Sequence, residues 1–310
     1  MKINNAKMTA LLEKMASKVS DCEYIWELPW RGINTRTWPV NAVTGKHYNG
    51  SNILTLLFSQ IVNDMSGNWA TYKQWAKAGR QVRKGEVGTP ILWFSMVPVK
   101  GSDEDARMPR WKYPNVFNET QLEDYIADMG EHDAPVFDEA KLKMAETFIA
   151  NCGVNIEQAA SAYYRPSTDT VYMPDKSLFI PTNDGTSALE NYVSTALHEI
   201  CHWTMAEARL NRKLSRPEEE CVVEIASVLL CVHLGISPCV RDTHASYVKS
   251  WGEKIGSDPA LLITLSRMAS KAFHYLLKLQ PEGFLEEIAA SHPDRNLCLT
   301  DMNYDNAAAA

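Results

Sequence analysis

The HEICH segment at residues 198–202 limits the possible folds of this chain more than any other stretch of its sequence. Residues four positions apart lie on one face of an α-helix, so the imidazoles of His198 and His202 can bind the same metal ion. Most neighbouring residues are apolar, which predicts a buried helix, and buried histidines need polar or metal partners. We therefore expect a metal-binding helix in which Glu199 acts as general base on the attacking water.

A third protein ligand is expected from the next helix, because catalytic zinc sites use three protein ligands and keep a fourth position open. Glu220 and Glu224 share one face of that helix, beside its apolar residues. Buried carboxylates are costly unless a cation holds them. We expect His198, His202 and Glu220 to bind one Zn²⁺, or Mn²⁺ or another divalent ion, while Glu224 orients a ligand histidine. The alternative exchanges the roles of the two glutamates, and the two glutamates directly before Glu220 are expected to face solvent.

Two further polar residues follow on a predicted helix over residues 241–254. His244 and Tyr247 are three residues apart, and either could stabilise an oxyanion that develops during hydrolysis. The alternative is that His244 caps a helix or packs in the core, together with Tyr247. His233 lies far along its helix from Glu220, and we expect it to be structural.

The formal charge of −7 is distributed unevenly along the chain. Residues 1–100 contain 13 Lys and Arg against 6 Asp and Glu, a net charge of +7, whereas residues 101–310 contain 18 against 32, a net charge of −14. A basic segment that also contains aromatic residues can bind nucleic acid, although the alternative is an ordinary solvated surface. The aromatic residues are Trp30, Trp38, Tyr48, Trp69, Tyr72 and Trp75, although most tryptophans are expected to pack in the core. The candidate contacts with DNA are Arg31, Arg36, Lys46, Tyr48, Lys73, Lys77, Arg80, Arg83 and Lys84.

Hydrophobic periodicity and turn residues predict many helices and a few strands. Strands over residues 91–97 and 113–118 are expected to pair as a hairpin, and residues 119–135 to connect two domains. The predicted fold is α+β, with a small N-terminal domain over residues 1–135 and a mainly helical C-terminal domain over residues 136–310. Helices are predicted over residues 3–20, 69–78, 138–151, 186–207, 217–234, 258–279 and 282–291 and from Ser51 onward, and short strands over 162–164 and 170–173.

The cellular environment is predicted from the cysteines and from the apolar segments. The seven cysteines are scattered without a CxxC pair, which is typical of reduced thiols rather than of a disulfide framework. The N-terminus lacks the apolar region of a signal peptide, and no run of 18 apolar residues predicts a membrane span. We therefore expect a soluble, cytoplasmic protein without a membrane partner.

Motifs in both halves resemble those of one known family. After HEICHW at residues 198–203, the run EECVVEIASVLLCVHLG at 219–235 resembles the zincin-like metallopeptidase domain of the ArdC antirestriction proteins. The motifs WPVNAVTGKHYNGSN, WATYKQ and GRQVRKGEVG, at residues 38–52, 69–74 and 79–88, are similar to the N-terminal domain of that family. The same domain is found attached to plasmid primases of the TraC type.

The resemblance implies an N-terminal domain that binds single-stranded DNA and a C-terminal zincin-like domain of the gluzincin type. It also implies a role in evading host restriction during transfer of a conjugative plasmid or another mobile element, with an unknown protein substrate such as a host restriction component. Zincins bind substrate along an edge strand beside the metal helix, and residues 170–173 are the expected strand. One alternative is a non-catalytic protein that coats single-stranded DNA and has a structural or vestigial metal site, and another is a nuclease that uses the same metal.

Overall fold

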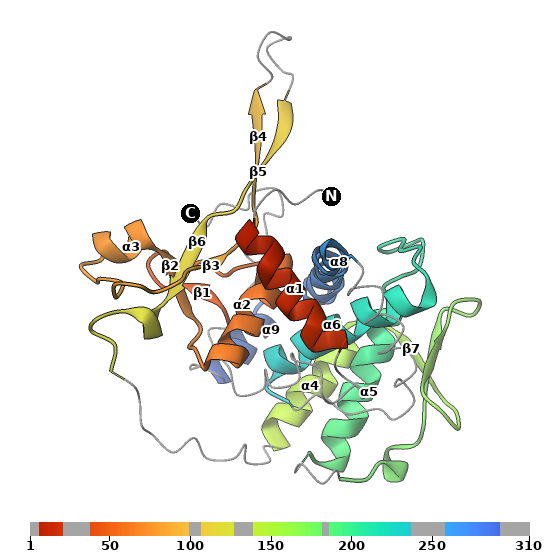
Figure 1. The fold of residues 1–310 in the computed structure, drawn as a ribbon. Helices are drawn as coiled ribbons and strands as arrows, with labels where there is room; N and C mark the ends of the chain where they lie inside the picture. Colours follow the sequence, from red (N-terminus) through yellow and green to blue (C-terminus); the bar gives the residue numbers. More distant parts are fainter. Residues whose placement is uncertain are drawn as a thin grey trace.

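The chain folds into two regions that lie side by side in the computed structural model (Figure 1). The structure describes residues 6–20, 38–98, 107–126, 139–181, 186–236 and 258–291. The N-terminal region is built around a four-stranded sheet, and the C-terminal region is mainly helical with a three-stranded sheet at its side. This mixture of helices and sheets confirms the predicted α+β fold.

The sheet of the N-terminal region has the strand order β1-β2-β6-β3. β1 and β2 are parallel, whereas β6 runs antiparallel to both β2 and β3. Tyr48, Trp69 and Val116 belong to a small hydrophobic core at this sheet. The elements of the region are α1 (Ala6–Ser20), β1 (Val40–Asn41), α2 (Ser51–Asn63), β2 (Asn68–Thr71), α3 (Tyr72–Lys77), β3 (Thr89–Pro90), β4 (Trp93–Pro98), β5 (Arg107–Lys112), β6 (Asn115–Asn118) and η3 (Glu119–Gln121).

The prediction of a helix over residues 69–78 is wrong for its first three residues, which belong to strand β2. The helix α3 begins at Tyr72, because Thr71 and Gln74 form a capping box. The Thr71 hydroxyl accepts a hydrogen bond from the backbone N–H of Gln74, and the Gln74 side chain accepts one from the backbone N–H of Thr71. Trp69 therefore packs in the sheet core and is fully buried.

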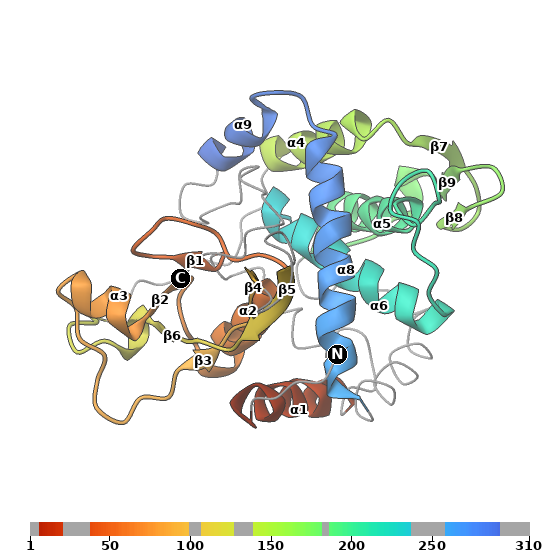
Figure 2. The same ribbon diagram turned by 90° about the horizontal axis from the view of Figure 1, so that it is seen from above.

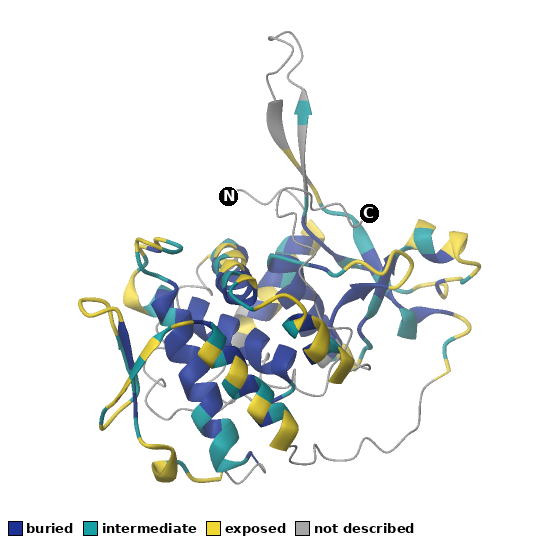
Figure 3. Ribbon diagram, turned by 180° about the vertical axis from the view of Figure 1, so that it is seen from behind, coloured by how far each residue is buried: buried dark blue, intermediate teal, exposed yellow. Residues whose placement is uncertain are grey.

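The predicted hairpin is present, but its second strand is not the expected one. β4 pairs antiparallel with β5, and the two strands project away from the body of the molecule (Figures 1 and 3). Residues 113–118 contain β6, which joins the central sheet instead. The backbone N–H of Ile91 donates to the carbonyl of Pro114 at 2.9 Å, so the chain returns to the sheet directly after β5. The strand that pairs with β4 is therefore the one that follows it first along the chain.

In the C-terminal region α5 and α6 pack against each other, and α8 packs against α6 (Figure 2). Gly235 ends α6 in the left-handed conformation, with φ 70°, as the sequence predicts. The predicted helix over residues 241–254 lies outside the described residues, and the other helices predicted here are confirmed within a few residues. The helices are α4 (Glu139–Asn151), η4 (Lys176–Leu178), α5 (Ala188–Trp203), α6 (Arg216–Leu234), α8 (Pro259–Lys278) and α9 (Phe284–Ser291). The buried cysteines Cys152, Cys201, Cys221 and Cys231 are reduced.

The small sheet of the C-terminal region packs against α5 through two of its strands, β8 and β9. Its strand order is β7-β9-β8, with β9 parallel to β7 and antiparallel to β8. The prediction that residues 170–173 form an edge strand is therefore wrong, because these residues are the central strand β9. The strand β7, which the sequence did not predict, pairs with one side of β9, and β8 pairs with the other. The edge strand that packs against α5 is therefore β8. The bounds are Asn155–Gln158 for β7, Tyr163–Arg165 for β8 and Thr170–Met173 for β9.

The two regions share one hydrophobic core, which contains residues of α1 and α2 as well as of α5, α6 and α8. Trp38 is fully buried and stacks on Phe273 of α8, with ring centroids 5.4 Å apart. The backbone N–H of Gly50 donates to the hydroxyl of Ser270 on α8 at 3.2 Å. The helix α8 therefore contacts both regions (Figure 2). The boundary predicted near residue 135 lies outside the described residues and stays a prediction.

The chain is expected to become less stable in mild acid, because the side chain of His274 on α8 is buried in this core and only 1 % exposed. Burial lowers the pKa of His274 from 6.5 to about 4. Above pH 6.5 the full contribution of the neutral ring is present. As pH falls, the unfolded chain binds a proton first, so the free energy of unfolding decreases by about 2 kcal/mol between pH 7.5 and pH 5. Urea unfolding of the metal-free chain at the two pH values measures this loss.

The control is the variant His274→Gln, whose side chain cannot ionise. Other groups also titrate in this range, but they are the same in both proteins. The variant should therefore lose about 2 kcal/mol less than the parent over the same pH interval. An equal loss in both proteins would contradict the assignment to His274.

Candidate metal centre

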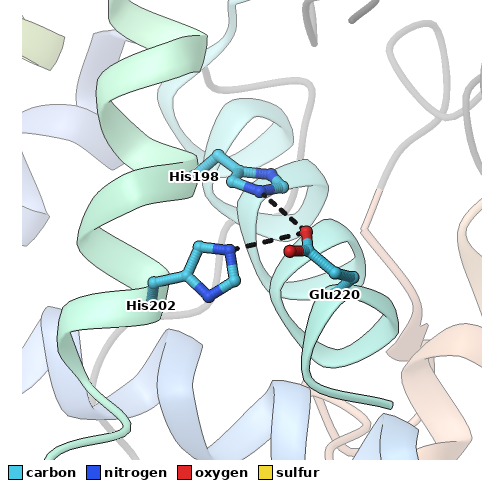
Figure 4. A group of neighbouring side chains, drawn as sticks. All are labelled: His198, His202 and Glu220. Carbon is cyan, nitrogen blue, oxygen red and sulfur yellow. Dashed lines mark ion pairs between the residues drawn. The ribbon is translucent and has the colours of Figure 1, made fainter. Parts of the chain in front are cut away.

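The two motif histidines lie on one face of the buried helix α5. The helix begins with a capping box, in which Ser187 and Glu190 satisfy each other's backbone N–H groups. It is covered by α4, by α6 and by the small sheet. The rings of His198 and His202 have centroids 5.0 Å apart, and both point toward α6 (Figure 4). The spacing of four residues therefore places the imidazoles side by side.

Glu220 of α6 completes this group of side chains. Its Oε2 atom lies 3.6 Å from Nε2 of His198 and 3.5 Å from Nε2 of His202 (Figure 4). One ligand atom from each of the three residues lies within 4.8 Å of the other two. All three side chains are largely buried, since their exposed fractions are 3 %, 14 % and 9 %.

These distances fit a tetrahedral metal ion. Two ligand atoms that each lie about 2.0–2.1 Å from a tetrahedral zinc ion are about 3.3–3.4 Å apart. The two distances from Glu220 exceed this value only slightly. Two imidazoles and one carboxylate are also the donor set of one class of catalytic zinc site, which leaves a fourth position open. The residues present are therefore suited to a divalent ion.

The second nitrogen of each histidine faces another carboxylate. Nδ1 of His198 lies 3.5 Å from Oε2 of Glu224, and Nδ1 of His202 lies 3.8 Å from Oε1 of Glu219. A carboxylate at Nδ1 favours the tautomer with its proton there, which leaves the Nε2 lone pair available to a metal. Glu224 lies where an outer partner of His198 would have to lie, and its role stays a prediction.

The expectation that Glu219 faces solvent is wrong, because this residue is only 5 % exposed. The buried side chain of Arg212 holds it, with Nε 3.0 Å from Oε2 of Glu219 and Nη2 paired with Oε1. Arg212 also donates from Nη1 to the Thr204 hydroxyl at 2.7 Å and from Nη2 to the Cys201 carbonyl at 2.9 Å. The arginine therefore fixes Glu219 against the end of α5. Nothing in the sequence pattern identified Arg212, which lies in the connection between α5 and α6.

The electrostatics of the site favour a bound cation. Burial opposes the charged form of His202, but the adjacent carboxylates of Glu219 and Glu220 outweigh this effect and raise the pKa of His202 to about 9. Burial opposes the ionised form of Glu220 as well, yet both histidines lower the pKa of this carboxyl. Without a metal, four buried carboxylates gather here against the buried Arg212 and the protonated His202, so a divalent ion would offset part of the remaining negative charge. The four are Glu199, Glu219, Glu220 and Glu224.

Of the other residues predicted in the C-terminal region, some are described by the structure and others are not. Glu199 is buried on α5 beside His198, in the position that the motif requires of a general base. His244 and Tyr247 lie outside the described residues, so their roles stay predictions. His233 is fully buried and contacts the ring of Phe273 at a centroid distance of 5.6 Å, in agreement with its expected structural role.

The basic N-terminal residues are not all equally available for binding. Arg80 pairs with Asp124 at 2.7 Å, and Arg83 pairs with Glu86 at 2.6 Å. Tyr48 is 2 % exposed and belongs to the sheet core, so its ring is covered. Arg31 and Arg36 lie outside the described residues. The side chains of Lys46, Lys73, Lys77 and Lys84 are exposed, and so is that of the paired Arg83.

Tyr72, one of the aromatic residues of the basic segment, is 47 % exposed at the start of α3. Its hydroxyl accepts a hydrogen bond from Nε2 of Gln81 at 2.7 Å, and its ring contacts that of Phe117 edge to face. The neighbouring Lys73 and Lys77 are one helical turn apart. An exposed ring beside two exposed lysines is suited to stacking with a base of single-stranded nucleic acid.

None of the helices in the described part of the chain is long and apolar enough to cross a membrane.

Comparisons with protein families identify both regions. The model of the N-terminal domain of anti-restriction factor ArdC matches residues 5–125, and a zincin-like metallopeptidase model matches residues 143–268. A protein of Sinorhizobium fredii (strain NGR234), y4eC, described as uncharacterized, is 32 % identical over an alignment of 283 positions, and the match covers 85 % of this chain and 89 % of that protein. A DNA primase TraC of Escherichia coli is 33 % identical over an alignment of 291 positions, and the match covers 84 % of this chain but 26 % of the primase.

Solved structures show the same relationship in three dimensions. The metal-free crystal structure of the antirestriction protein ArdC from plasmid R388 has a TM-score of 0.68 and 27 % identity, and the match covers 91 % of this chain and 97 % of that one. The Mn(II)-bound structure of the R388 protein has a TM-score of 0.67 and 26 % identity, with coverage of 93 % and 99 %. The chain described here belongs to the ArdC antirestriction family and combines an ArdC-type N-terminal domain with a zincin-like domain.

Proposed function

We propose that this chain is a cytoplasmic antirestriction protein of a plasmid or another mobile element, with two activities. Residues 1–135 bind single-stranded DNA, and residues 136–310 hydrolyse peptide bonds in a protein substrate, such as a host restriction component. The observation that carries the proposal is the convergence of ligand atoms of His198, His202 and Glu220 within 4.8 Å of one another, beside the buried Glu199. The Mn(II)-bound structure of the ArdC protein from plasmid R388 supports both a divalent metal and a mobile element.

The hydrolysis follows from the placement of these side chains. A Zn²⁺ or other divalent ion bound by the three ligands would polarise the peptide carbonyl and lower the pKa of the attacking water. Glu199 accepts a proton from that water and donates it to the leaving amine. The carboxylates of Glu219 and Glu224 hold the ligand imidazoles in the required tautomer and orientation. An extended peptide would lie along β8, the edge strand next to α5.

The variant Glu199→Ala tests whether hydrolysis is needed for antirestriction. The change removes the general base but none of the proposed ligands, so metal content, thermal stability and DNA binding should be retained. Protection of incoming plasmid DNA in a restricting host should be lost, and so should cleavage of host proteins. Glu207→Ala, at an exposed glutamate just beyond α5, is the matched control and should protect fully. Full protection by Glu199→Ala would instead favour the non-catalytic DNA-coating function.

Binding of single-stranded DNA is expected to depend on Tyr72. A base that stacks on an exposed aromatic ring contributes about 1–3 kcal/mol, so Tyr72→Ala should weaken binding roughly 5- to 100-fold. Lys73 and Lys77 extend along the same helix and supply charge for phosphates. Fluorescence anisotropy with a labelled oligothymidine measures the affinity, and the parent affinity should fall as salt is increased.

Tyr72→Phe is the control, because it keeps the ring and removes only the hydroxyl that Gln81 contacts. This variant should bind within about twofold of the parent. Unchanged binding by Tyr72→Ala would exclude stacking at this position.

A further inference from the structure

Two tyrosines and one arginine form a platform on the small sheet, which we call the Arg165 platform and define as Tyr163, Arg165 and Tyr172. Tyr163 of β8 and Tyr172 of β9 are cross-strand neighbours, and their rings stack with centroids 4.8 Å apart at 19°. The guanidinium of Arg165 lies 5.3 Å from the first ring centroid and 4.8 Å from the second. Its Nη2 also donates to the Tyr163 hydroxyl at 2.9 Å. An exposed arginine is thus held in one orientation.

The platform lies on the face of the sheet that is turned away from α5. Side chains along a strand alternate between the two faces. Val171 and Met173 of β9 are buried in the main core, so Tyr172 between them lies on the opposite face. Arg165 and Tyr163 are two residues apart on β8 and share that face. The platform is therefore on the solvent side of the edge strand.

The charge of Arg165 is not paired with any carboxylate of the described residues. The neighbouring arginines differ in this respect, since Arg209 pairs with Asp169 and Arg212 pairs with Glu219. Glu157 of β7 is the direct cross-strand neighbour of Tyr172 on this face, but β9 separates it from β8. A guanidinium that is already ordered loses little side-chain entropy when it binds an anion, and its planar donors match a carboxylate.

The strand β8 is fixed relative to the metal-binding end of α5. The hydroxyl of Tyr164 donates to Asp169 at 2.8 Å and accepts from Nη2 of Arg209 at 3.2 Å. Arg209 in turn donates from Nε to the carbonyl of Trp203 at 2.6 Å, one residue beyond His202. A peptide that adds to β8 places every second side chain on the platform face.

We propose that Arg165 selects an acidic side chain of the peptide substrate, so that preferred substrates carry Asp or Glu on this face of the extended segment. The inference rests on the proposed peptide binding and adds the class of substrate. The carboxylate forms a charge-assisted, bidentate pair with the guanidinium. The two tyrosine rings position the guanidinium for this contact.

A binding experiment that needs no catalysis tests the proposal. Two fluorescein-labelled ten-residue peptides are compared, one with Glu at every second position and the other with Gln at the same positions. The protein is the full-length Glu199→Ala variant loaded with Zn²⁺. We expect the Glu peptide to bind about tenfold more tightly than the Gln peptide at low salt. Arg165→Gln should remove this difference without changing the affinity for the Gln peptide.

The controls separate this contact from a general charge effect. Lys213→Gln removes one positive charge from the exposed connection between α5 and α6, and it should leave the preference intact. Arg165→Lys should keep only part of the preference, because a lysine cannot form the bidentate pair. Equal affinities of the two peptides, a preference that survives Arg165→Gln, or no binding of either peptide would overturn the proposal.

Cleavage is measured separately with the chain that retains Glu199. If the Gln peptide is cleaved as well as the Glu peptide, hydrolysis is supported and the role of Arg165 is excluded. If the Glu peptide binds through Arg165 but no peptide is cleaved, the role of Arg165 is supported and hydrolysis is excluded.

Discussion

Replacing Glu220 by glutamine is expected to lower the affinity for Zn²⁺ by more than about 100-fold, because loss of an outer partner alone costs about 10- to 100-fold. Oε2 of Glu220 is the carboxylate atom that faces Nε2 of both His198 and His202. Glutamine keeps the size of the side chain but removes its negative charge. Competition with a chromophoric chelator measures the affinity, and the metal-to-protein ratio after dialysis gives an independent readout.

Glu224→Gln is the matched control on the same helix. Glu224 faces Nδ1 of His198 rather than Nε2, so its loss should weaken Zn²⁺ binding by only about 10- to 100-fold. Repeating both titrations with Mn²⁺ tests whether the site distinguishes the two ions. If Glu224→Gln loses the metal while Glu220→Gln retains it, the roles of the two glutamates are exchanged.

The helices of the candidate site could be predicted because each contains a periodic pattern that does not depend on distant residues. The apolar residues around His198 and along α6 repeat at helical spacing. The spacing of four residues places His198 and His202 on one face of α5. The apolar neighbours of Glu220 indicate that it lies on the buried face of α6. A helix–helix contact between α5 and α6 then brings the three side chains together.

Features that depend on distant parts of the chain could not be predicted in the same way. Glu219 follows a polar stretch and reads as a solvent-exposed residue, yet Arg212 from the preceding loop holds it in the core. Trp69 lies in a segment with helical character, but pairing with β6 places it in a strand. The stacking of Trp38 on Phe273 joins segments that are more than 200 residues apart. In each case a tertiary contact overrides a local preference.

Replacing Arg212 by methionine is expected to reduce the free energy of unfolding of the metal-free chain by about 3–5 kcal/mol, because it breaks a buried ion pair and leaves one charge without compensation. The side chains of Arg212 and Glu219 are only 4 % and 6 % exposed, so water cannot replace the lost contact. Arg212 also satisfies the Thr204 hydroxyl and the Cys201 carbonyl. Urea unfolding at neutral pH measures the effect. Arg80→Met, which removes the exposed pair with Asp124, is the control and should have a much smaller effect.

The double variant Arg212→Met/Glu219→Gln distinguishes the cost of the unpaired charge from the cost of lost packing. If the charge left on Glu219 causes the destabilisation, removing it should restore most of the stability, so that the double variant is more stable than Arg212→Met alone. The same double variant should still bind Zn²⁺ about 10- to 100-fold more weakly than the parent, because Nδ1 of His202 then lacks its carboxylate. Effects of the two substitutions on stability that simply add would show that the charge left on Glu219 does not cause the destabilisation. Recovery of stability without recovery of metal affinity would show that this ion pair orients His202 for the metal.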